Sequence, residues 1–230
     1  MGADKNQAPA TVYQLKVSLR DISPMLWRRL LVTSSTTIAQ LHDILQAVMG
    51  WEDLHLHQFR VHGKEYGIYR EGGMCFDDDP NEVTLATFKL RAGEHFAYEY
   101  DMGDFWQHDI RLERVLPLDP SKTYPVCIGG AGDCPPEDCG GPWGYRNLIE
   151  ERCSWEEIEQ AREDLLLVAQ RLLAFVEGGP RPTDEDTEFM DALERMHDRL
   201  EDAPTAFNRR AVNAALRTLK KELPCTSASN

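Results

Sequence analysis

One irregular stretch organises the chain: Cys127-Ile-Gly-Gly-Ala-Gly-Asp-Cys-Pro-Pro-Glu-Asp-Cys-Gly-Gly-Pro-Trp-Gly-Tyr145. Its glycines favour backbone angles that other residues avoid, and its prolines lack the N–H group that a helix or a sheet requires. We therefore expect neither a helix nor a strand to run through it. Such a segment stays ordered only where side chains hold it in place. The candidates for that role are Cys127, Cys134 and Cys139.

These cysteines suggest a structural zinc site. Zinc takes four Cys or His ligands in a tetrahedron, and cysteines of a reducing compartment are more often ligands or free thiols than disulfides. We expect His57 as the fourth ligand, with His55 or His108 as alternatives. On a strand, His55 and His57 would present both imidazoles on one face. The spacing is not the close Cys-x-x-Cys pair, so three buried thiols packing a turn-rich loop explain the same sequence.

Composition limits the class of protein. The 230 residues are 42% hydrophobic and 28% charged, as in an ordinary globular protein. Asp and Glu outnumber Lys and Arg by 39 to 25, a net charge of −14. Binding to a phosphate backbone depends on clustered basic residues, so a protein partner is favoured over nucleic acid, although a local basic face remains compatible with this balance.

The same sequence predicts a cytoplasmic protein. No apolar run reaches the length of about 18 residues that a transmembrane helix needs. The first ten residues lack the apolar core of a signal peptide. We therefore expect no membrane association.

Hydrophobic periodicity predicts an α+β domain. Alternation over residues 13–19 and an apolar run over 26–32 indicate an antiparallel hairpin. Thr37-Ile-Ala-Gln40 is a capping box that begins a helix, and Gly50 ends it. Further strands are expected over 55–62 and in a hairpin over 96–112. This order predicts a β-grasp-like fold, in which a mixed, ubiquitin-like sheet wraps over one helix.

The expected domain limits follow from the same patterns. Residues 1–11 form a flexible leader, and residues 12–150 form the β-grasp-like domain with its cysteine-, glycine- and proline-rich loop. Residues 151–223 form a helical C-terminal extension packed on that domain, with Ser154 as the N-cap of its first helix. Residues 224–230 form a flexible tail.

Several short, unusual sequence motifs occur one after another along the chain. They are Trp27-Arg-Arg-Leu30, Leu41-His42, Met49-Gly-Trp51, His55-Leu-His57, Tyr100-Asp-Met-Gly-Asp-Phe-Trp-Gln-His108, Cys134-Pro-Pro-Glu-Asp-Cys-Gly-Gly141, Gly144-Tyr145 and Phe207-Asn-Arg-Arg-Ala-Val-Asn213. Together they resemble the plasmid pRiA4b ORF-3-like family over residues 12–150 and 205–220. The resemblance implies a fold related to the β-grasp. Some members are described as mobile-element passenger or resolvase-like proteins, but no nucleophilic Ser in an Arg-rich pocket supports a recombinase here.

The hairpin over 96–112 carries the candidates for catalysis if the protein is an enzyme: Asp101, Asp104 and His108. With Glu137 and Asp138 of the loop, they could bind a divalent metal and activate water. Turn-stabilising hydrogen bonds from Asx residues to backbone N–H groups explain the two aspartates more simply. We therefore favour a protein that is not an enzyme.

The sequence thus predicts a non-catalytic binding or interaction module with a structural zinc ion. The residues expected on its binding surface are Trp106, Trp143, Tyr145, Arg28 and Arg29. One alternative is a metal-dependent hydrolase or nuclease centred on Asp104 and His108. A second is an accessory protein of a mobile element or DNA transaction. Neither a Ser-His-Asp order nor a phosphate-binding glycine loop is present.

Overall fold

The computed structural model describes residues 11–68, 75–183, 185–201 and 207–222. They fall into two compact units, which are described separately. The first comprises the described residues through Pro142 together with those from Phe207 onward, and the second comprises those that begin at Trp143 and end before Phe207. The predicted leader 1–11, apart from Thr11, and the predicted tail 224–230 lie outside the described residues.

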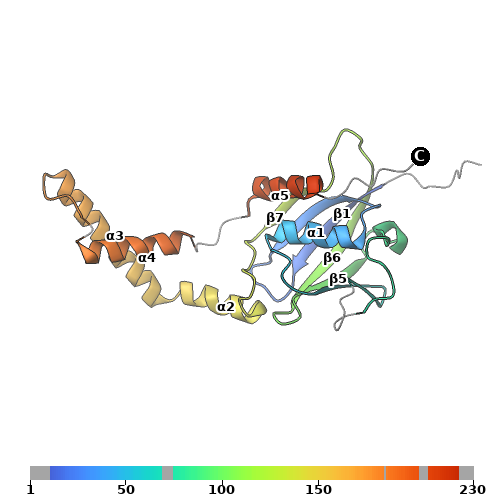
Figure 1. The fold of residues 1–230 in the computed structure, drawn as a ribbon, viewed down its shortest axis with the longest axis horizontal. Coiled ribbons are helices and arrows are strands. Elements are labelled where there is room, and N and C mark those ends of the chain that lie inside the picture. Colours follow the sequence, from blue (N-terminus) through green and yellow to red (C-terminus); the bar gives the residue numbers. More distant parts are fainter. Residues whose placement is uncertain (1–10, 69–74, 184, 202–206, 223–230) are drawn as a thin grey trace, which may run out of the picture. The chain divides into compact units, whose positions relative to one another are not determined.

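The first unit is built on a seven-stranded sheet with the order β4-β3-β5-β6-β1-β2-β7 (Figure 1). Its strands are β1 (Thr11–Leu19), β2 (Trp27–Thr33), β3 (His57–Val61), β4 (Lys64–Tyr66), β5 (His95–Tyr100), β6 (Trp106–Pro117) and β7 (Val126–Ala131). All six strand pairings are antiparallel. The prediction of an α+β fold is confirmed, but the expectation of a mixed sheet was wrong, because β1 has antiparallel neighbours on both sides.

Helix α1 (Ile38–Met49) lies across one face of this sheet (Figure 1). Its start is the predicted capping box: the Thr37 hydroxyl accepts from the Gln40 N–H, and the Gln40 side chain accepts from the Thr37 N–H. Its end is the predicted Gly50, whose φ of 80° is the left-handed conformation that glycine adopts without strain. A single 3₁₀ turn, η1 (Leu85–Phe88), follows later in the chain.

Strand alternation divides the sheet into an apolar and a polar face. The core lies between α1 and the apolar face, where many side chains are completely buried, among them Leu15, Leu30, Phe59, Tyr98 and Ile110. The alternate positions of the same strands carry polar side chains such as Gln14, Lys16 and Arg29. This arrangement is typical of an antiparallel sheet that packs on one side only.

As expected, no helix or strand runs through the stretch from Cys127 to Tyr145, but a regular element enters it at each end. β7 contains its first residues, and α2 (Gly141–Arg152) contains its last ones. β7 is an edge strand, and the side-chain amide of Asn213 in α5 (Arg209–Glu222) caps that edge. The Cys127 N–H donates to Asn213 Oδ1 at 2.9 Å, and Asn213 Nδ2 donates to the Cys127 carbonyl at 2.8 Å.

The second unit contains α3 (Trp155–Val176) and α4 (Thr187–Glu201), with Ser154 as the predicted N-cap of α3. A small apolar core is centred on Val168 and Phe189. Asp164, only 2% exposed, binds Arg195 and Arg199, and these arginines hold the pKa of its carboxyl well below the usual range.

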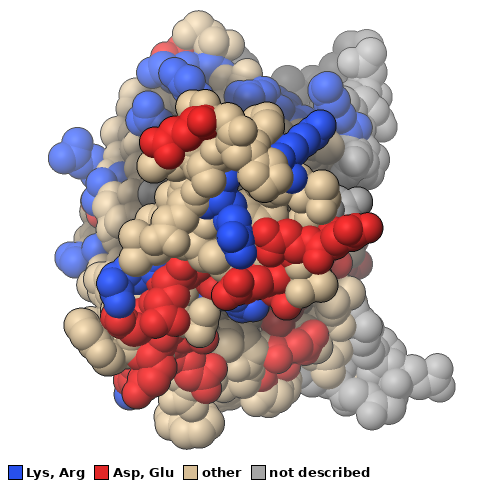
Figure 2. Space-filling view, turned by 90° about the vertical axis from the view of Figure 1, so that its left-hand side faces the viewer, with Lys and Arg blue, Asp and Glu red and all other residues tan. Residues whose placement is uncertain are grey.

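The limits of the second unit differ from the expected domain limits. Residues 151–223 were expected to form one helical region, whereas α5 belongs to the sheet-containing unit. None of the described helices is both long and apolar enough to span a membrane. Figure 2 shows acidic side chains gathered on one part of a face and basic side chains among and around them, so the net charge of −14 does not make that face uniformly acidic.

The close approach of Phe207 to β7 makes Gly130 a test of this packing. A Cβ atom at Gly130 would lie 2.7 Å from a ring carbon of Phe207, whereas a Cβ at Gly129 would lie 3.5 Å from Trp27, which is ordinary contact. Overpacking of this kind costs about 1–3 kcal/mol. We expect Gly130→Ala to lower the free energy of unfolding by that amount in urea denaturation, and Gly129→Ala to leave it nearly unchanged. Equal stabilities of the two variants would contradict this packing.

Candidate functional site

Arg28 of β2 holds the start of the loop that follows β7. Its side chain is buried, and its Nε donates to the Val48 carbonyl at 3.1 Å. Its Nη1 donates to the carbonyls of Ala131 and Gly132, both at 3.0 Å. The guanidinium also lies 4.7 Å from the ring centroid of Phe207. Burial lowers the pKa of Arg28. Arg28 was expected on a binding surface, but it is an internal brace because backbone carbonyls surround its charge.

Hydrogen bonds from the segment after α1 and from the end of β5 hold the middle of the loop. The Trp51 indole N–H donates to the Pro135 carbonyl at 2.9 Å. The Tyr100 hydroxyl donates to Glu137 and accepts from the Leu54 N–H at 3.0 Å. Burial and the neighbouring Glu137 carboxylate raise the pKa of Tyr100. The loop therefore has ordinary hydrogen-bonding partners that the sequence did not reveal.

Asp104, in the turn between β5 and β6, holds the end of the loop. Its Oδ2 accepts from the Gly140 N–H at 3.1 Å. The next residue, Gly141, has a φ of 68°, and a Cβ there would lie 2.2 Å from the Asp104 carbonyl oxygen. Only glycine fits this approach, so Asp104 serves as a backbone acceptor at a tight junction.

The predicted cysteine ligands are not gathered at one point. Among the described residues, two groups of three or more potential ligand atoms lie within 4.8 Å of one another, and neither contains a cysteine. Cys127 is buried in β7, and its thiol contacts the Gly129 carbonyl at 3.4 Å. Burial raises the pKa values of Cys127, Cys134 and Cys139, which favours protonated thiols. A zinc site formed by these cysteines and His57 stays a prediction.

The first of the two groups consists of His42, Asp53 and His57. His42 Nε2 lies 2.9 Å from Asp53 Oδ1, and its Nδ1 lies 2.9 Å from the Tyr98 hydroxyl. Burial raises the pKa of Tyr98 well above its usual value, so the hydroxyl keeps its proton and can donate it to Nδ1. The Tyr98 oxygen in turn accepts from Gln46 Nε2 at 3.0 Å. With the Tyr98 hydroxyl as donor to Nδ1, the other ring nitrogen of His42 is the one that faces Asp53.

The stacking of His42 on His57 is unfavourable for a shared metal ion. The two rings are 3.5 Å apart and nearly parallel, with an angle of 9° between their planes. A metal ion lies in the plane of each imidazole that binds it, about 2.0–2.1 Å from the nitrogen. One ion cannot lie in two parallel planes that are this far apart. We therefore attribute the first group to ring stacking between the two buried histidines and to the hydrogen bonds of His42, not to a shared ion.

The second group consists of His55, Asp101 and Asp138, from three different loops. His55 Nε2 lies 2.9 Å from Asp138 Oδ1 and 3.6 Å from Asp101 Oδ2. The nitrogen atom is buried, yet it makes no geometrically acceptable hydrogen bond with the described residues. The other oxygen of Asp101 accepts from the Gly103 N–H at 2.8 Å, which fixes the carboxylate. Three potential ligands thus face one point without satisfying one another.

An unusual backbone conformation directs the two carboxylates of this group towards His55. Asp101 and Asp138 have φ values of 56° and 58°, in the left-handed region that aspartate adopts more readily than most residues. The Asp101 N–H also donates to the Leu56 carbonyl at 2.9 Å, which joins its turn to the segment that carries His55. His55 precedes β3, whereas His57 is its first residue. The two imidazoles therefore belong to different groups.

Comparison with known proteins agrees with the motifs of the sequence. A family model described as plasmid pRiA4b ORF-3-like protein matches residues 11–171. The chain belongs to this family. The match extends beyond the expected limit at residue 150 into α3, and it does not include residues 205–220.

Two relatives of this pRiA4b ORF-3-like protein carry no stated activity. The uncharacterized protein y4hQ of Sinorhizobium fredii is 38% identical over 142 residues, which are 61% of this chain and 73% of that protein. The crystal structure of the protein of unknown function MM3350 from Methanosarcina mazei Go1 is similar, with a TM-score of 0.59 and 36% identity. That similarity covers 66% of this chain and 87% of that one.

His108, proposed as a catalytic residue of this pRiA4b ORF-3-like protein, is completely enclosed. Its side chain has no exposed surface, and neither ring nitrogen has a hydrogen-bonding partner among the described residues. Burial lowers its pKa to about 4. His108 and Asp104 do not share a ligand group. An enclosed, neutral imidazole of this kind cannot reach a substrate without a rearrangement of the core.

The expected binding surface is divided among unrelated places. Trp106 is 0% exposed, so it is a core residue. Arg29 makes an ion pair with Glu113 at 2.7 Å on the polar face of the sheet. Trp143, 72% exposed, and the partly buried Tyr145 lie in α2. The apolar or basic character of these residues was visible in the sequence, but their burial depends on contacts between distant strands.

A matched pair of substitutions tests the role of Arg28. Arg28→Gln would leave several buried carbonyls with fewer donors, whereas Arg29→Gln removes only a partly exposed ion pair. We expect a loss of about 2–4 kcal/mol in the free energy of unfolding for Arg28→Gln, and about 1 kcal/mol or less for Arg29→Gln. Urea denaturation measures both. A larger loss for Arg29→Gln would contradict the bracing role.

The buried His108 predicts a pH dependence of stability. In the unfolded chain it takes up a proton below pH 6.5, whereas in the folded chain it stays neutral down to about 4. Stability is therefore lost as pH falls through this window. Between pH 7 and pH 5 the contribution is about 2 kcal/mol, at 1.4 kcal/mol per pKa unit.

The variant His108→Leu should lose stability less than the wild-type protein when the pH is lowered from 7 to 5. His62→Gln, which changes an exposed histidine, is the matched control and should behave as the wild-type protein does. Urea denaturation at both pH values measures the difference. An identical pH dependence of wild type and His108→Leu would show that His108 does not remain neutral in the fold.

Proposed function

We propose that this protein is a non-catalytic binding module whose loops hold a zinc ion through His55, Asp101 and Asp138. The observation that supports it is the buried His55 Nε2, which faces two carboxylates at 2.9 and 3.6 Å without making an acceptable hydrogen bond. A proton shared between histidine and carboxylate would favour a straight hydrogen bond. Ligands of one metal ion meet side by side instead.

The distances within this group suit a metal ion. Ligands about 2.1 Å from zinc are about 3.4 Å apart in a tetrahedron and about 3.0 Å apart in an octahedron. The two measured separations lie close to these values. Nitrogen and carboxylate oxygen are both ligands that zinc accepts. Because the ligands come from three loops, the ion would fasten the segment after α1, the β5–β6 turn and the loop after β7 to one another.

Exposed apolar side chains around these loops support binding of a partner protein. Leu54, Met102 and Phe105 are 60%, 38% and 48% exposed. Met25, 55% exposed, lies in the β1–β2 turn, which is tied to the same end of the sheet by a bond from the Arg20 N–H to the Gln107 carbonyl. Apolar contacts surrounded by carboxylates suit a partner with a basic surface.

The alternatives have less support in the arrangement of these residues. A hydrolase centred on Asp104 and His108 would need both groups free for substrate, but Asp104 binds the backbone and His108 is enclosed. A role in a DNA transaction would place phosphates near the carboxylates of this end. We place the protein in the cytoplasm, since the described cysteines are free.

Titration of the purified protein with zinc tests the proposal. Asp101→Asn keeps an oxygen that can accept from the Gly103 N–H, but it removes the charged ligand. We expect one zinc ion per chain in the wild-type protein and an affinity at least about tenfold lower in Asp101→Asn, since even changes next to ligands cost that much. Cys134→Ser is the matched control and should bind as the wild-type protein does.

Two results would contradict this assignment. If Cys134→Ser lost zinc binding and Asp101→Asn kept it, the ligands would be the cysteines and not the group that contains Asp101. Absence of stoichiometric zinc binding by the wild-type protein, measured by calorimetry and elemental analysis, would remove the metal from the proposal.

A further inference from the structure

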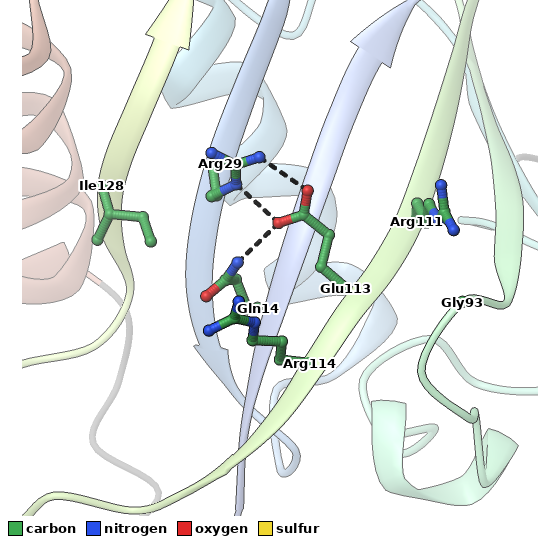
Figure 3. Close-up of a pocket in the computed structure, with 7 residues that line it drawn as sticks. All are labelled: Gln14, Arg29, Gly93, Arg111, Glu113, Arg114 and Ile128. Carbon is green, nitrogen blue, oxygen red and sulfur yellow. Dashed lines mark hydrogen bonds and ion pairs between the residues drawn. The ribbon is translucent and has the colours of Figure 1, made fainter.

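The polar face of the sheet, opposite α1, contains a hollow (Figure 3). Its volume is about 590 Å³. The residues that line it are Gln14, Arg29, Gly93, Arg111, Glu113, Arg114 and Ile128. They come from β1, β2, β6, β7 and the turn before β5. The hollow lies in the sheet-containing unit and shares no residue with the loops discussed above.

Two β-bulges shape this hollow. In the pairing of β1 with β6, Gln14 faces Arg114 and Leu15 faces Leu112, so Glu113 is an extra residue. Since Glu113 is inserted, Glu113 and Arg114 both reach the polar face. In the pairing of β2 with β7, the corresponding extra residue is Ile128. Bulges redirect side chains and are frequent beside functional sites, and here both border the same hollow.

Ion pairing leaves two arginines of the hollow without a partner. Arg29 binds Glu113 through two hydrogen bonds, at 2.7 and 2.8 Å, and Gln14 donates to the same carboxylate at 2.7 Å (Figure 3). The side chains of Arg111 and Arg114 make no hydrogen bond or ion pair with any residue that the structure describes.

The other carboxylates of the polar face have basic partners of their own. Asp109 lies 3.7 Å from Arg20, and Glu99 lies 3.6 Å from Arg60. They are therefore not free to neutralise the hollow. The two arginines form a local excess of positive charge in a protein whose net charge is −14.

We propose that this hollow binds the phosphate groups of a small molecule through Arg111 and Arg114, which lie on opposite sides of Glu113 (Figure 3). A guanidinium presents several N–H donors in a plane and pairs with phosphate oxygens through two parallel hydrogen bonds. Gln14, whose amide already donates to Glu113, closes the side next to Arg114. The carboxylate of Glu113 is itself bound by Arg29, so it repels an incoming anion less than a free carboxylate would.

A small phosphate compound fits the hollow better than a nucleic acid. The volume is of the size that small-molecule sites have. A long polyanion would need basic residues beyond the hollow, whereas the neighbouring arginines Arg20 and Arg60 are engaged with carboxylates. A chain with this net charge also repels a long polyanion at a distance.

Isothermal titration with pyrophosphate and with ATP tests the proposal. We expect saturable binding at low salt and at least a tenfold loss of affinity in the double variant Arg111→Gln/Arg114→Gln, since each charged hydrogen bond to phosphate is worth about that factor. The matched control, Lys220→Gln/Lys221→Gln, removes the same charge from exposed positions of α5 and should bind as the wild-type protein does.

Further arms decide what the hollow recognises. Citrate, a carboxylate anion, should bind at least tenfold more weakly than pyrophosphate, and equal binding would overturn the assignment to phosphate. Binding of a single-stranded oligonucleotide without binding of pyrophosphate or ATP would overturn a small-molecule site. Equal losses in the arginine variant and the lysine control would overturn the location, and absence of binding by every phosphate probe would overturn the proposal altogether.

Discussion

The buried guanidinium of Arg28 is the constraint on which the candidate site depends. One charged group donates to carbonyls at the end of α1 and at the end of β7, and it packs against Phe207 from the segment before α5. A buried charge is costly unless several acceptors surround it. Because the acceptors belong to two segments far apart in sequence and the Phe207 ring belongs to a third, the charge is stable only when all three are in place. Arg28 thereby fixes where the loop after β7 begins.

Further hydrogen bonds hold the rest of the loop after β7 in place, beyond the part that Arg28 binds. Trp51 holds Pro135, Tyr100 holds Glu137, and Asp104 holds Gly140. Two of these partners, Trp51 and Tyr100, are core residues, so the loop cannot move without disturbing the core. For this reason the loop can present Asp138 to His55 at a defined distance although it contains no regular structure of its own.

The sequence predicted the elements whose signals are local. The Thr37 and Gln40 cap, the Gly50 stop and the alternation of β1 are set by neighbours in the chain, and the structure confirms them. The strand β7 was missed because a run of glycines looks unstructured until Phe207 and Asn213 are brought against it. The mixed sheet was wrong because it was inferred from the order of the elements along the chain, and that order does not determine which strands become neighbours in the sheet.

The candidate site could be predicted only in part, because it too depends on contacts between segments that are far apart in sequence. His55 and Asp101 were recognised as candidate ligands from their residue types. Three cysteines in one loop favoured a metal centre of their own, because nothing in the sequence indicated that Arg28 and Trp51 would hold that loop. Asp138 was named as a possible metal ligand beside Asp101, but its pairing with His55 depends on the fold, which turns its backbone into the left-handed region. Arg114 reaches the polar face through a bulge that hydrophobic patterns do not reveal.

The amide cap that Asn213 places on Cys127 has a consequence for biosynthesis. The second unit is inserted, in sequence, between the last strand and the helix that covers its edge. During translation the nascent sheet therefore waits, with an open hydrogen-bonding edge, until the inserted helices have left the ribosome. Open edges of this kind recruit strands of other chains. A prematurely terminated polypeptide that lacks α5 would thus be prone to self-association. In the full chain, the inserted unit delays the moment at which α5 covers the edge of β7.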